Sequence, residues 1–446
     1  MTEQDDIPPE PTGETSFLSL GLPSVMVHAL RRIGIDTPFP IQNATIPDVL
    51  AGRDVLGRGP TGSGKTLAFG LPMLVRLRGS ASRRGFPRGL ILAPTRELAL
   101  QIERALDEPA LSVGLRVATV VGGVPLKRQV DQIGRGVDLL VATPGRLADH
   151  LGKRTISLDD VLVTTIDEAD HMAELGFLPQ VEAVLDATPP QGQRLLYSAT
   201  LDGEVDTLVE RYLRDPVAHE TSAAQAATAT MDHFLFHVRT SDKFDVVSQI
   251  ASRTGRTLLF VRTREGVDRL SEQLHAVGVA VESLHGDKTQ SRRNRALEAF
   301  TRNATGVLVA TDVAARGIHV DDVSLVVHVD PPLETKDYVH RAGRTARAGQ
   351  SGIVVTLVTE VERDQVDRML DRAGIEIAAY DIAPGDATLR RITGARRPSG
   401  VPVAPSDTTP PPPSTSAPKR SGGRNRIAPG SRQARRGPRR GGRTTR

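Results

Sequence analysis

The feature that most constrains the fold is an internal repetition at a fixed distance along the chain. The segment that begins at Arg88, RGLILAPTREL, aligns with RTLLFVRTREG, which begins at Arg256, at an offset of 168 residues. The same offset carries residues 141–143 onto residues 309–311, because both read Val-Ala-Thr. One such match between two buried strands can arise by chance. Two matches at one offset indicate two related domains in tandem.

Short β-branched runs alternate with helical patterns over the first 380 residues or so, as in α/β proteins with parallel sheets. The periodic pattern lapses at residues 221–230, TSAAQAATAT, whose alanines can equally form a short helix. The length of 446 residues also favours two domains over one. The predicted division is a disordered N-terminus at 1–16, a first domain at 17–222, a linker at 223–230, a second domain at 231–385 and a disordered tail at 386–446.

The charge of the chain is divided unevenly. Residues 391–446 hold 14 Lys and Arg against one acid, Asp407, whereas the first 390 residues hold 43 bases and 52 acids. The Pro, Ser, Gly and Arg of the tail cannot build a core, so we expect disorder. Such a tail is either a solvated end or, as its Arg density favours, an arm that binds polyanions without reading their sequence.

The composition limits the cellular compartment in which the protein is expected and the catalytic groups that it can use. The chain has no Cys, which excludes disulfides and thiol catalysis and favours the cytoplasm. Its first residues are acidic and polar, unlike a secretory signal, and no apolar run approaches the roughly 20 residues of a membrane helix. We therefore expect a cytoplasmic protein that does not act in a membrane.

A glycine-rich loop follows a short apolar run and precedes a helical pattern. It reads GPTGSGKT, from Gly59 to Thr66. In that context its glycines let backbone N–H groups surround phosphates, the Lys supplies a cation to the β and γ phosphates, and the final Thr hydroxyl can ligate Mg²⁺. The predicted nucleotide-binding residues of this loop are Thr61, Gly62, Ser63, Gly64, Lys65 and Thr66.

Two acids close the apolar run VLVTTI and should project toward the same phosphates. Asp167 is predicted to hold Mg²⁺ through water, and Glu168 to orient or deprotonate the attacking water. Taken alone, the sequence Asp-Glu-Ala-Asp is an acidic turn. The presence of Lys65 in the same domain favours a catalytic role.

A cationic run in the second domain, HRAGRTAR, places Arg344 and Arg347 on one helix face. A solvated basic helix is the ordinary explanation of such a run. The first domain, however, has phosphate-binding groups and acids but no obvious Arg of its own. We therefore predict that these two residues act as arginine fingers on the γ phosphate.

Taken together, these motifs resemble those of the DEAD-box ATP-dependent RNA helicases, in that family's order and over residues 17 to about 350. The resemblance rests on GIDTPFPIQ, GPTGSGKT, PTREL, Gly122 with Gly123, TPGR, DEAD, SAT, LLFVRTR, Gln290 with Arg293, ATDVAARG and HRAGRTAR. It implies two tandem RecA-like domains that bind ATP, Mg²⁺ and RNA. It also implies that Phe17 and Gln42 read adenine and that Ser198 and Thr200 link hydrolysis to domain closure.

The resemblance further implies a track for single-stranded RNA, contacted mostly at phosphates and sugars. The residues that match the family there are Arg96, Gly123, Thr143, Arg146, Arg262, Arg293 and Thr311. One departure concerns the nucleotide side: after Gly317 the family usually continues Ile-Asp, whereas this chain has His319 near the expected ribose. An imidazole accepts fewer hydrogen bonds than a carboxylate, which bears on nucleotide affinity.

The expected activity is therefore ATP-driven local unwinding or remodelling of RNA, single-stranded or in short duplexes, by a monomer. A DNA translocase is the rival enzyme, because phosphate contacts are common to both nucleic acids and only the 2′-hydroxyl distinguishes them. An RNA-annealing protein, with the basic tail doing the principal work, is the alternative from another class. Ribosome assembly and RNA degradation are the expected kinds of partner complex.

Overall fold

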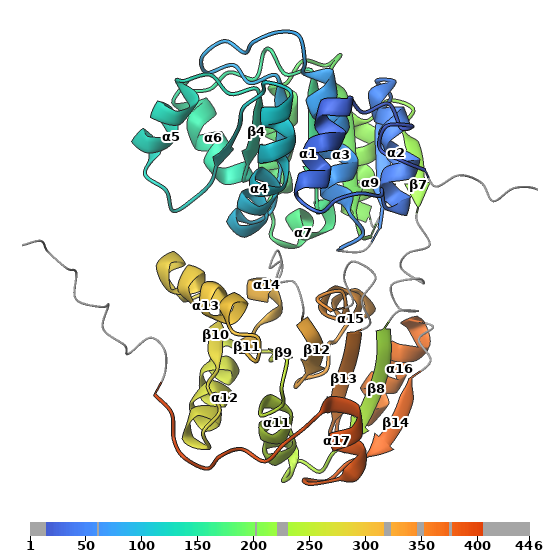
Figure 1. Ribbon diagram of the computed structural model, residues 1–446, viewed down its shortest axis with the longest axis vertical. Helices are drawn as coiled ribbons and strands as arrows, with labels where there is room; N and C mark the ends of the chain where they lie inside the picture. Colours follow the sequence, from blue (N-terminus) through green and yellow to red (C-terminus); the bar gives the residue numbers. More distant parts are fainter. Residues whose placement is uncertain are drawn as a thin grey trace, which may run out of the picture. The chain divides into compact units, whose positions relative to one another are not determined.

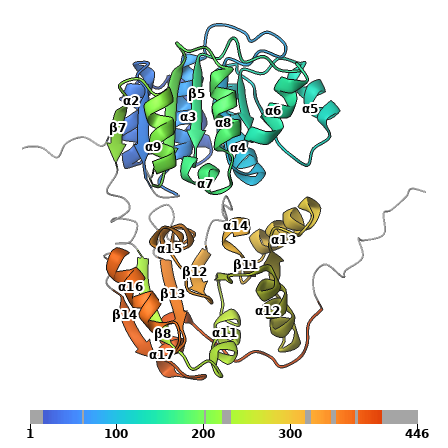
Figure 2. The ribbon, with the colours of Figure 1, turned by 180° about the vertical axis from the view of Figure 1, so that it is seen from behind.

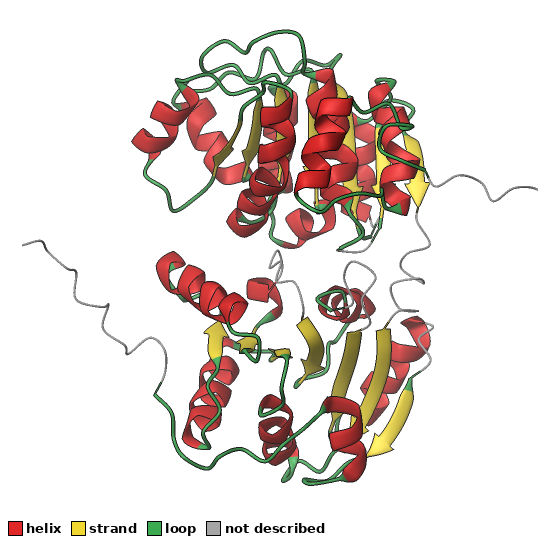
Figure 3. Cartoon of the chain, in the orientation of Figure 1, coloured by secondary structure: helices red, strands yellow, loops and turns green. Residues whose placement is uncertain are grey.

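The strands form two parallel sheets of seven strands each, counted over the residues that the computed structural model describes: 15–59, 62–200, 203–220, 231–315, 323–345, 352–373 and 377–404. Every strand pairing in these ranges is parallel. Helices cover both faces of each sheet (Figure 3). The predicted α/β class with tandem parallel-sheet domains is confirmed.

The first sheet has the strand order β3-β4-β2-β5-β6-β1-β7. Its strands are β1 (Val55–Arg58), β2 (Gly89–Leu92), β3 (Val117–Val120), β4 (Leu139–Ala142), β5 (Val163–Asp167), β6 (Gln193–Ser198) and β7 (Val217–Glu220). The inner strands β2, β4, β5 and β6 are buried along their whole length. That burial explains why β2 and β4, which read GLIL and LLVA, are continuous apolar runs rather than alternating patterns.

The helices of this domain divide between the two faces of the sheet. Helices α1 to α4 supply one apolar core with the strands, and α5 to α9 supply the other (Figures 1 and 2). The helices are α1 (Ser24–Arg32), α2 (Pro40–Leu50), α3 (Lys65–Arg76), α4 (Arg96–Ser112), α5 (Leu126–Ile133), α6 (Pro144–Gly152), α7 (Ala169–Glu174), α8 (Leu178–Asp186) and α9 (Gly203–Tyr212).

The second sheet has the order β10-β11-β9-β12-β13-β8-β14. Its strands are β8 (Met231–His237), β9 (Arg256–Phe260), β10 (Glu282–Leu284), β11 (Val307–Ala310), β12 (Val323–His328), β13 (Gly352–Val358) and β14 (Ala378–Asp381). Helices α11, α12 and α17 cover one face, and α13 to α16 cover the other. The helices are α11 (Lys243–Ala251), α12 (Arg264–Ala276), α13 (Gln290–Arg302), α14 (Asp312–Ala315), α15 (Thr335–Ala342), α16 (Arg363–Ala373) and α17 (Ala387–Thr393).

The two sheets repeat each other position by position, which explains the offset found in the sequence. Strands β2 and β9 both occupy the third place, and β4 and β11 both occupy the second. The helix after the third-place strand is capped in the same way in both copies. Thr95 Oγ1 accepts a hydrogen bond from Leu98 N at 3.2 Å, and Thr263 Oγ1 accepts one from Gly266 N at 3.0 Å.

Residues 386–404, which the sequence assigned to a disordered tail, are ordered on the second domain. Helix α17 buries Leu389 and Ile392, and the segment that follows it lies along α11 and α12. In that segment Arg396 N donates to Gln249 O and Val403 N donates to His275 O, both at 2.9 Å. We call residues 394–404 the strap. Leu389 and Ile392 are three residues apart, as on one face of a helix, but the Arg and Pro around them led an interpretation based on composition to predict disorder.

The remaining boundary predictions fall mostly outside the described residues. The linker at 223–230 and residues 1–14 and 405–446 lie there. Among the described helices, none combines the length and the apolar character needed to span a bilayer.

The strap generates a first prediction. Deleting residues 386–446 should lower the free energy of unfolding of the second domain by roughly 3 kcal/mol or more, since Leu389 and Ile392 each contribute about 1.5–3 kcal/mol on burial. Deleting only 405–446 should leave that domain unchanged. Urea unfolding of both truncated proteins measures the difference. Equal midpoints would show that α17 and the strap add no stability.

Candidate active site

The glycine-rich loop joins the carboxyl end of β1 to the start of α3. Gly62 and Gly64 have φ angles of 89° and 90°, in the left-handed region that other residues rarely adopt. A Cβ on Gly64 would also lie 2.5 Å from Nε2 of Gln42. Two independent constraints therefore require glycine at the residue before Lys65. Pro60 and Thr61 lie outside the described residues.

The polar groups of this loop suit a phosphate. Lys65 is buried, and its Nζ lies 2.5 Å from Gly59 O. Ser63 Oγ is buried and has no hydrogen-bond partner among the described residues. The loop thus offers a hydroxyl and an amine, together with the first backbone N–H groups of α3, where a helix favours anions.

The two acids at the end of β5 have opposite electrostatic surroundings. Burial raises the pKa of Asp167 to about 7, although Lys65 opposes this effect. Burial acts on Glu168 as well, but the hydrogen bond and charge of His171, with Arg344 and Lys65, outweigh it and lower the pKa of Glu168 to about 2. Glu168 is therefore the carboxylate that stays ionised, and Asp167 is the one that a cation would stabilise.

The oxygen donors fit Mg²⁺ carried by a nucleotide. Thr66 offers a hydroxyl and Asp167 a carboxylate, and Mg²⁺ usually binds through one or two carboxylates together with substrate phosphates. The described residues contain no cluster of three or more His, Cys, Asp or Glu able to hold an ion. Phosphate oxygens and water would thus complete the coordination.

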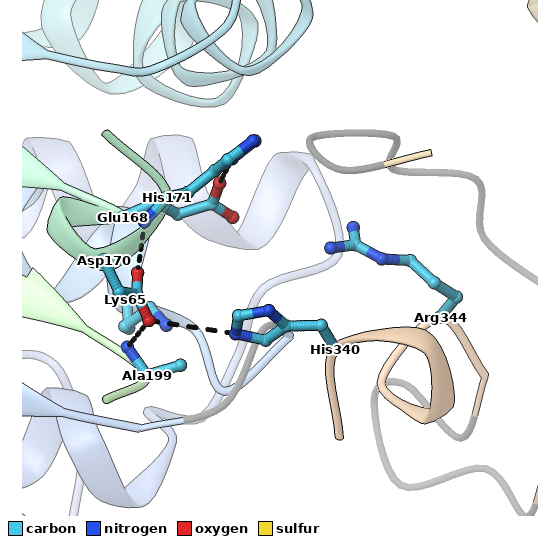
Figure 4. Close-up of a pocket in the computed structure, with 7 residues that line it drawn as sticks. All are labelled: Lys65, Glu168, Asp170, His171, Ala199, His340 and Arg344. Carbon is cyan, nitrogen blue, oxygen red and sulfur yellow. Dashed lines mark hydrogen bonds and ion pairs between the residues drawn. The ribbon is translucent and has the colours of Figure 1, made fainter. Parts of the chain in front are cut away.

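Asp170 joins three motifs through one carboxylate oxygen, as the close-up shows (Figure 4). Its Oδ2 accepts from Ala199 N at 3.2 Å and from Thr200 N and Oγ1 at 3.0 and 3.1 Å. Ser198 Oγ accepts from Asp170 N at 3.3 Å. On the other side, Nε2 of His340 lies 3.8 Å from the same oxygen. The predicted pair Ser198 and Thr200 is therefore held to the DEAD motif by a residue that the sequence analysis left unassigned.

Residues of both domains line one pocket around these groups (Figure 4). Arg344 follows α15, is 4% exposed, and contributes to the low pKa of Glu168. The other predicted arginine finger, Arg347, lies outside the described residues. The pocket is lined by Lys65, Glu168, Asp170, His171, Ala199, His340 and Arg344.

The residues expected to read adenine have other contacts. Phe17 is 1% exposed and packs into the core of the first domain. The amide of Gln42 is also buried: its Nε2 donates to Gly64 O at 3.0 Å, and its Oε1 accepts from Phe39 N at 2.8 Å. Gln42 thus ties α2 to the phosphate loop. Gly317 and His319 lie outside the described residues.

In the first domain, the residues predicted to contact RNA gather around one turn, residues 122–124. Arg96 Nη1 donates to Gly122 O at 3.4 Å, and a Cβ on Gly123 would meet the same guanidinium. Arg146 Nη1 donates to Val124 O at 2.6 Å. Thr143 precedes α6 at the end of β4, and its side chain does not cap that helix.

In the second domain, the corresponding residues are more scattered. Arg262 Nη2 donates to Pro331 O at 3.3 Å, and Thr311 N donates to Leu284 O, also at 3.3 Å. Arg293 lies 3.5 Å from Oε1 of Glu97, the acid of the PTREL segment. That oxygen also accepts from Gln290 Nε2 at 2.7 Å, so this pair bridges the two domains.

Sequence reasoning missed several residues of the site. Asp170 and His340 stood within quoted motifs and His171 directly follows DEAD, but only the fold brings the three together. Arg264 was detectable, because the offset of 168 aligns it with Arg96. Its guanidinium lies beside Gly286 as that of Arg96 lies beside Gly123.

Comparisons with known proteins agree with this geometry. Residues 39–208 match the family model of the DEAD/DEAH box helicases, and residues 242–349 match that of the helicase conserved C-terminal domain. The chain is 38% identical over 350 residues to the ATP-dependent RNA helicase CshA of Limosilactobacillus reuteri, covering 78% of this chain and 70% of that protein.

Solved structures give the same result. The S. cerevisiae protein Dbp5 bound to RNA and ADP BeF3 is 27% identical, with a TM-score of 0.77 over 85% of this chain and 99% of that one. Mss116p bound to ssRNA and AMP-PNP is 26% identical, with a TM-score of 0.73 over 86% and 83%. With both family models matched in order around one shared pocket, the chain belongs to the DEAD/DEAH box helicase family.

Proposed function

We propose that the protein is an ATP-dependent RNA helicase that remodels RNA locally by closing its two RecA-like domains over ATP and RNA. The observation that carries the proposal is the pocket in which Lys65 and Glu168 of the first domain meet Arg344 of the second. We propose RNA rather than DNA as the substrate because the structures of two similar proteins, Dbp5 and Mss116p, were solved with RNA bound. Cytoplasmic location and a monomeric state belong to the same proposal.

Nucleotide binding falls to the loop after β1. The N–H groups of residues 62–66 surround the phosphates, and Lys65 moves from Gly59 O to a phosphate oxygen. Thr66 and Asp167 hold Mg²⁺, which neutralises phosphate charge when bound. Gln42 connects α2 to this loop through its hydrogen bond to Gly64 O, so a nucleotide bound at the loop also affects α2.

Glu168 and Arg344 carry out hydrolysis. An ionised Glu168 accepts a hydrogen bond from water and aligns it with the γ phosphorus. The water oxygen bonds to phosphorus, the bond to the β–γ bridging oxygen breaks, and the water proton leaves toward the carboxylate or phosphate. Arg344, with Arg347, stabilises the charge that develops on the γ-phosphate oxygens.

Coupling and RNA binding follow from the remaining contacts. Asp170 ties Ser198 and Thr200 to His340 and so transmits the state of the hydrolysis site to the second domain. On the RNA side, Arg96, Arg146 and Arg264 bind phosphates, Gly123 and Gly286 let the backbone of the strand approach, and Thr143, Arg262, Arg293 and Thr311 complete the track. We take the domains as 17–222 and 231–404, with the basic tail starting at 405.

Ribosome assembly and RNA degradation are the two settings that we propose for the activity. Both present structured RNA to a remodelling enzyme. Sequencing of RNA crosslinked to the protein would distinguish them.

Substitutions at the phosphate loop and at the acid pair should separate binding from hydrolysis. Lys65→Ala should weaken ATP binding by about 10- to 100-fold, because a charged contact is lost. Glu168→Gln should leave binding nearly intact but lower turnover by about 10²- to 10⁴-fold and trap an RNA complex. ATP affinity and RNA-stimulated hydrolysis measure the two effects, with the exposed Lys153→Ala as control. Normal turnover in Glu168→Gln contradicts the assignment, as would RNA-independent hydrolysis by the unmodified protein.

Arg344→Ala should lower RNA-stimulated turnover by at least about a hundredfold, because an arginine finger contributes about 10³ to 10⁵ in rate. RNA affinity without nucleotide should change little. The matched control is Arg363→Ala, which removes an exposed arginine of α16 paired with Asp381. Turnover within a few-fold of the unmodified protein would exclude Arg344 as the finger.

Deleting residues 405–446 tests the tail, which carries 11 Lys and Arg in that range. Basal hydrolysis should persist, while the slope of log affinity for RNA against log salt should flatten by roughly 0.7 per lost contact, about 4 if half of the bases touch phosphates. An unchanged slope identifies a solvated end. Loss of strand annealing with normal unwinding would instead support the annealing role.

A further inference from the structure

His171 is a buried titratable residue that the mechanism above does not use. It lies in the first turn of α7, three residues after Glu168, and its side chain is 2% exposed. It lines the same pocket as Lys65 and Arg344. Nothing in the nucleotide chemistry described so far requires an imidazole at this position.

The imidazole makes one directed contact, with the proposed general base. Its Nδ1 lies 3.2 Å from Glu168 Oε2 (Figure 4). An ionised carboxylate only accepts hydrogen bonds, so this contact requires the proton on Nδ1. The other ring nitrogen, Nε2, is buried without a partner among the described residues. The contact at Nδ1 is therefore the one that gives the buried ring a polar partner among the described residues.

Glu168 has an unusual backbone conformation, and its side chain makes no capping bond to the helix that follows. Its φ angle is 53°, an unfavourable region for a residue other than glycine, and it precedes α7 without capping the helix. The hydrogen bond from His171 orients its carboxyl group through Oε2. Lys65 and Arg344 also attract the carboxylate through their charge.

We propose that His171 is a positioning residue for hydrolysis: its Nδ1–H holds Oε2 of Glu168 and leaves Oε1 to align the attacking water. This inference rests on the proposed function, because it assigns a task within the same ATP site. The low pKa of Glu168 agrees with it, since the hydrogen bond from His171 favours the ionised form.

Three substitutions distinguish positioning from packing. His171→Leu keeps volume but removes the donor. His171→Asn keeps an N–H near the place of Nδ1, whereas His171→Gln moves its N–H to the place of Nε2. The control is His219→Leu, which breaks a similar histidine–carboxylate pair with Asp48 at 2.7 Å outside the pocket.

The experiment measures kcat and KM for ATP with the full chain at saturating RNA, together with ATP affinity and the thermal unfolding temperature. Loss of one hydrogen bond to a charged group predicts a kcat about tenfold or more lower in His171→Leu and His171→Gln, with KM and ATP affinity within about twofold. His171→Asn should recover most of kcat, and His219→Leu should match the unmodified protein.

A double substitution adds a readout that packing cannot imitate. If His171 acts through Glu168, then His171→Leu should cause no further loss of single-turnover rate in a Glu168→Gln background. Equal kcat in the Leu and Asn proteins, or additive losses in the double variant, would overturn the positioning role. Lack of RNA-stimulated hydrolysis in the unmodified protein would overturn the proposed function and this inference together, so the two failures are distinguishable.

Discussion

The arrangement of the site depends on a single buried carboxylate, that of Asp170. One oxygen accepts three hydrogen bonds from Ala199 and Thr200 and faces His340 of the second domain. A buried carboxylate is tolerated only when such donors satisfy it. These donors therefore compensate for its burial and join the start of α7 to the end of β6, so that displacing either element breaks hydrogen bonds with the other.

The two neighbouring acids show how one strand end can supply different chemistry. Asp167 and Glu168 are adjacent and both buried, yet burial dominates for the first and nearby donors and cations for the second. Their pKa values move in opposite directions as a result. Asp167 is the last residue of β5, whereas Glu168 follows it with a left-handed backbone, so the two carboxyl groups have different neighbours and Glu168 lies beside His171 of α7.

The sequence predicted the features that repeat or that follow known loop chemistry. The offset of 168 residues led to the tandem sheets, and GPTGSGKT and DEAD led to the two strand ends where phosphate groups would meet. It did not predict that Gln42 contacts Gly64 or that Asp170 contacts Ala199 and Thr200, because these partners lie 22, 29 and 30 residues away in the chain. It also missed α17 and the strap, because Leu389 and Ile392 stand among arginines and carry little weight until the second domain provides an apolar surface for them.

The matched order of the two sheets has a consequence for stoichiometry. Strand β8 occupies the place of β1, yet it is followed by Val-Arg-Thr rather than by a glycine-rich loop, so the two copies differ here, and the second contributes Arg344 to the pocket instead. Separate subunits that share a site in this way would assemble according to their concentration. Here the two domains belong to one chain, so the approach of Arg344 to Lys65 is an intramolecular step whose rate does not depend on protein concentration.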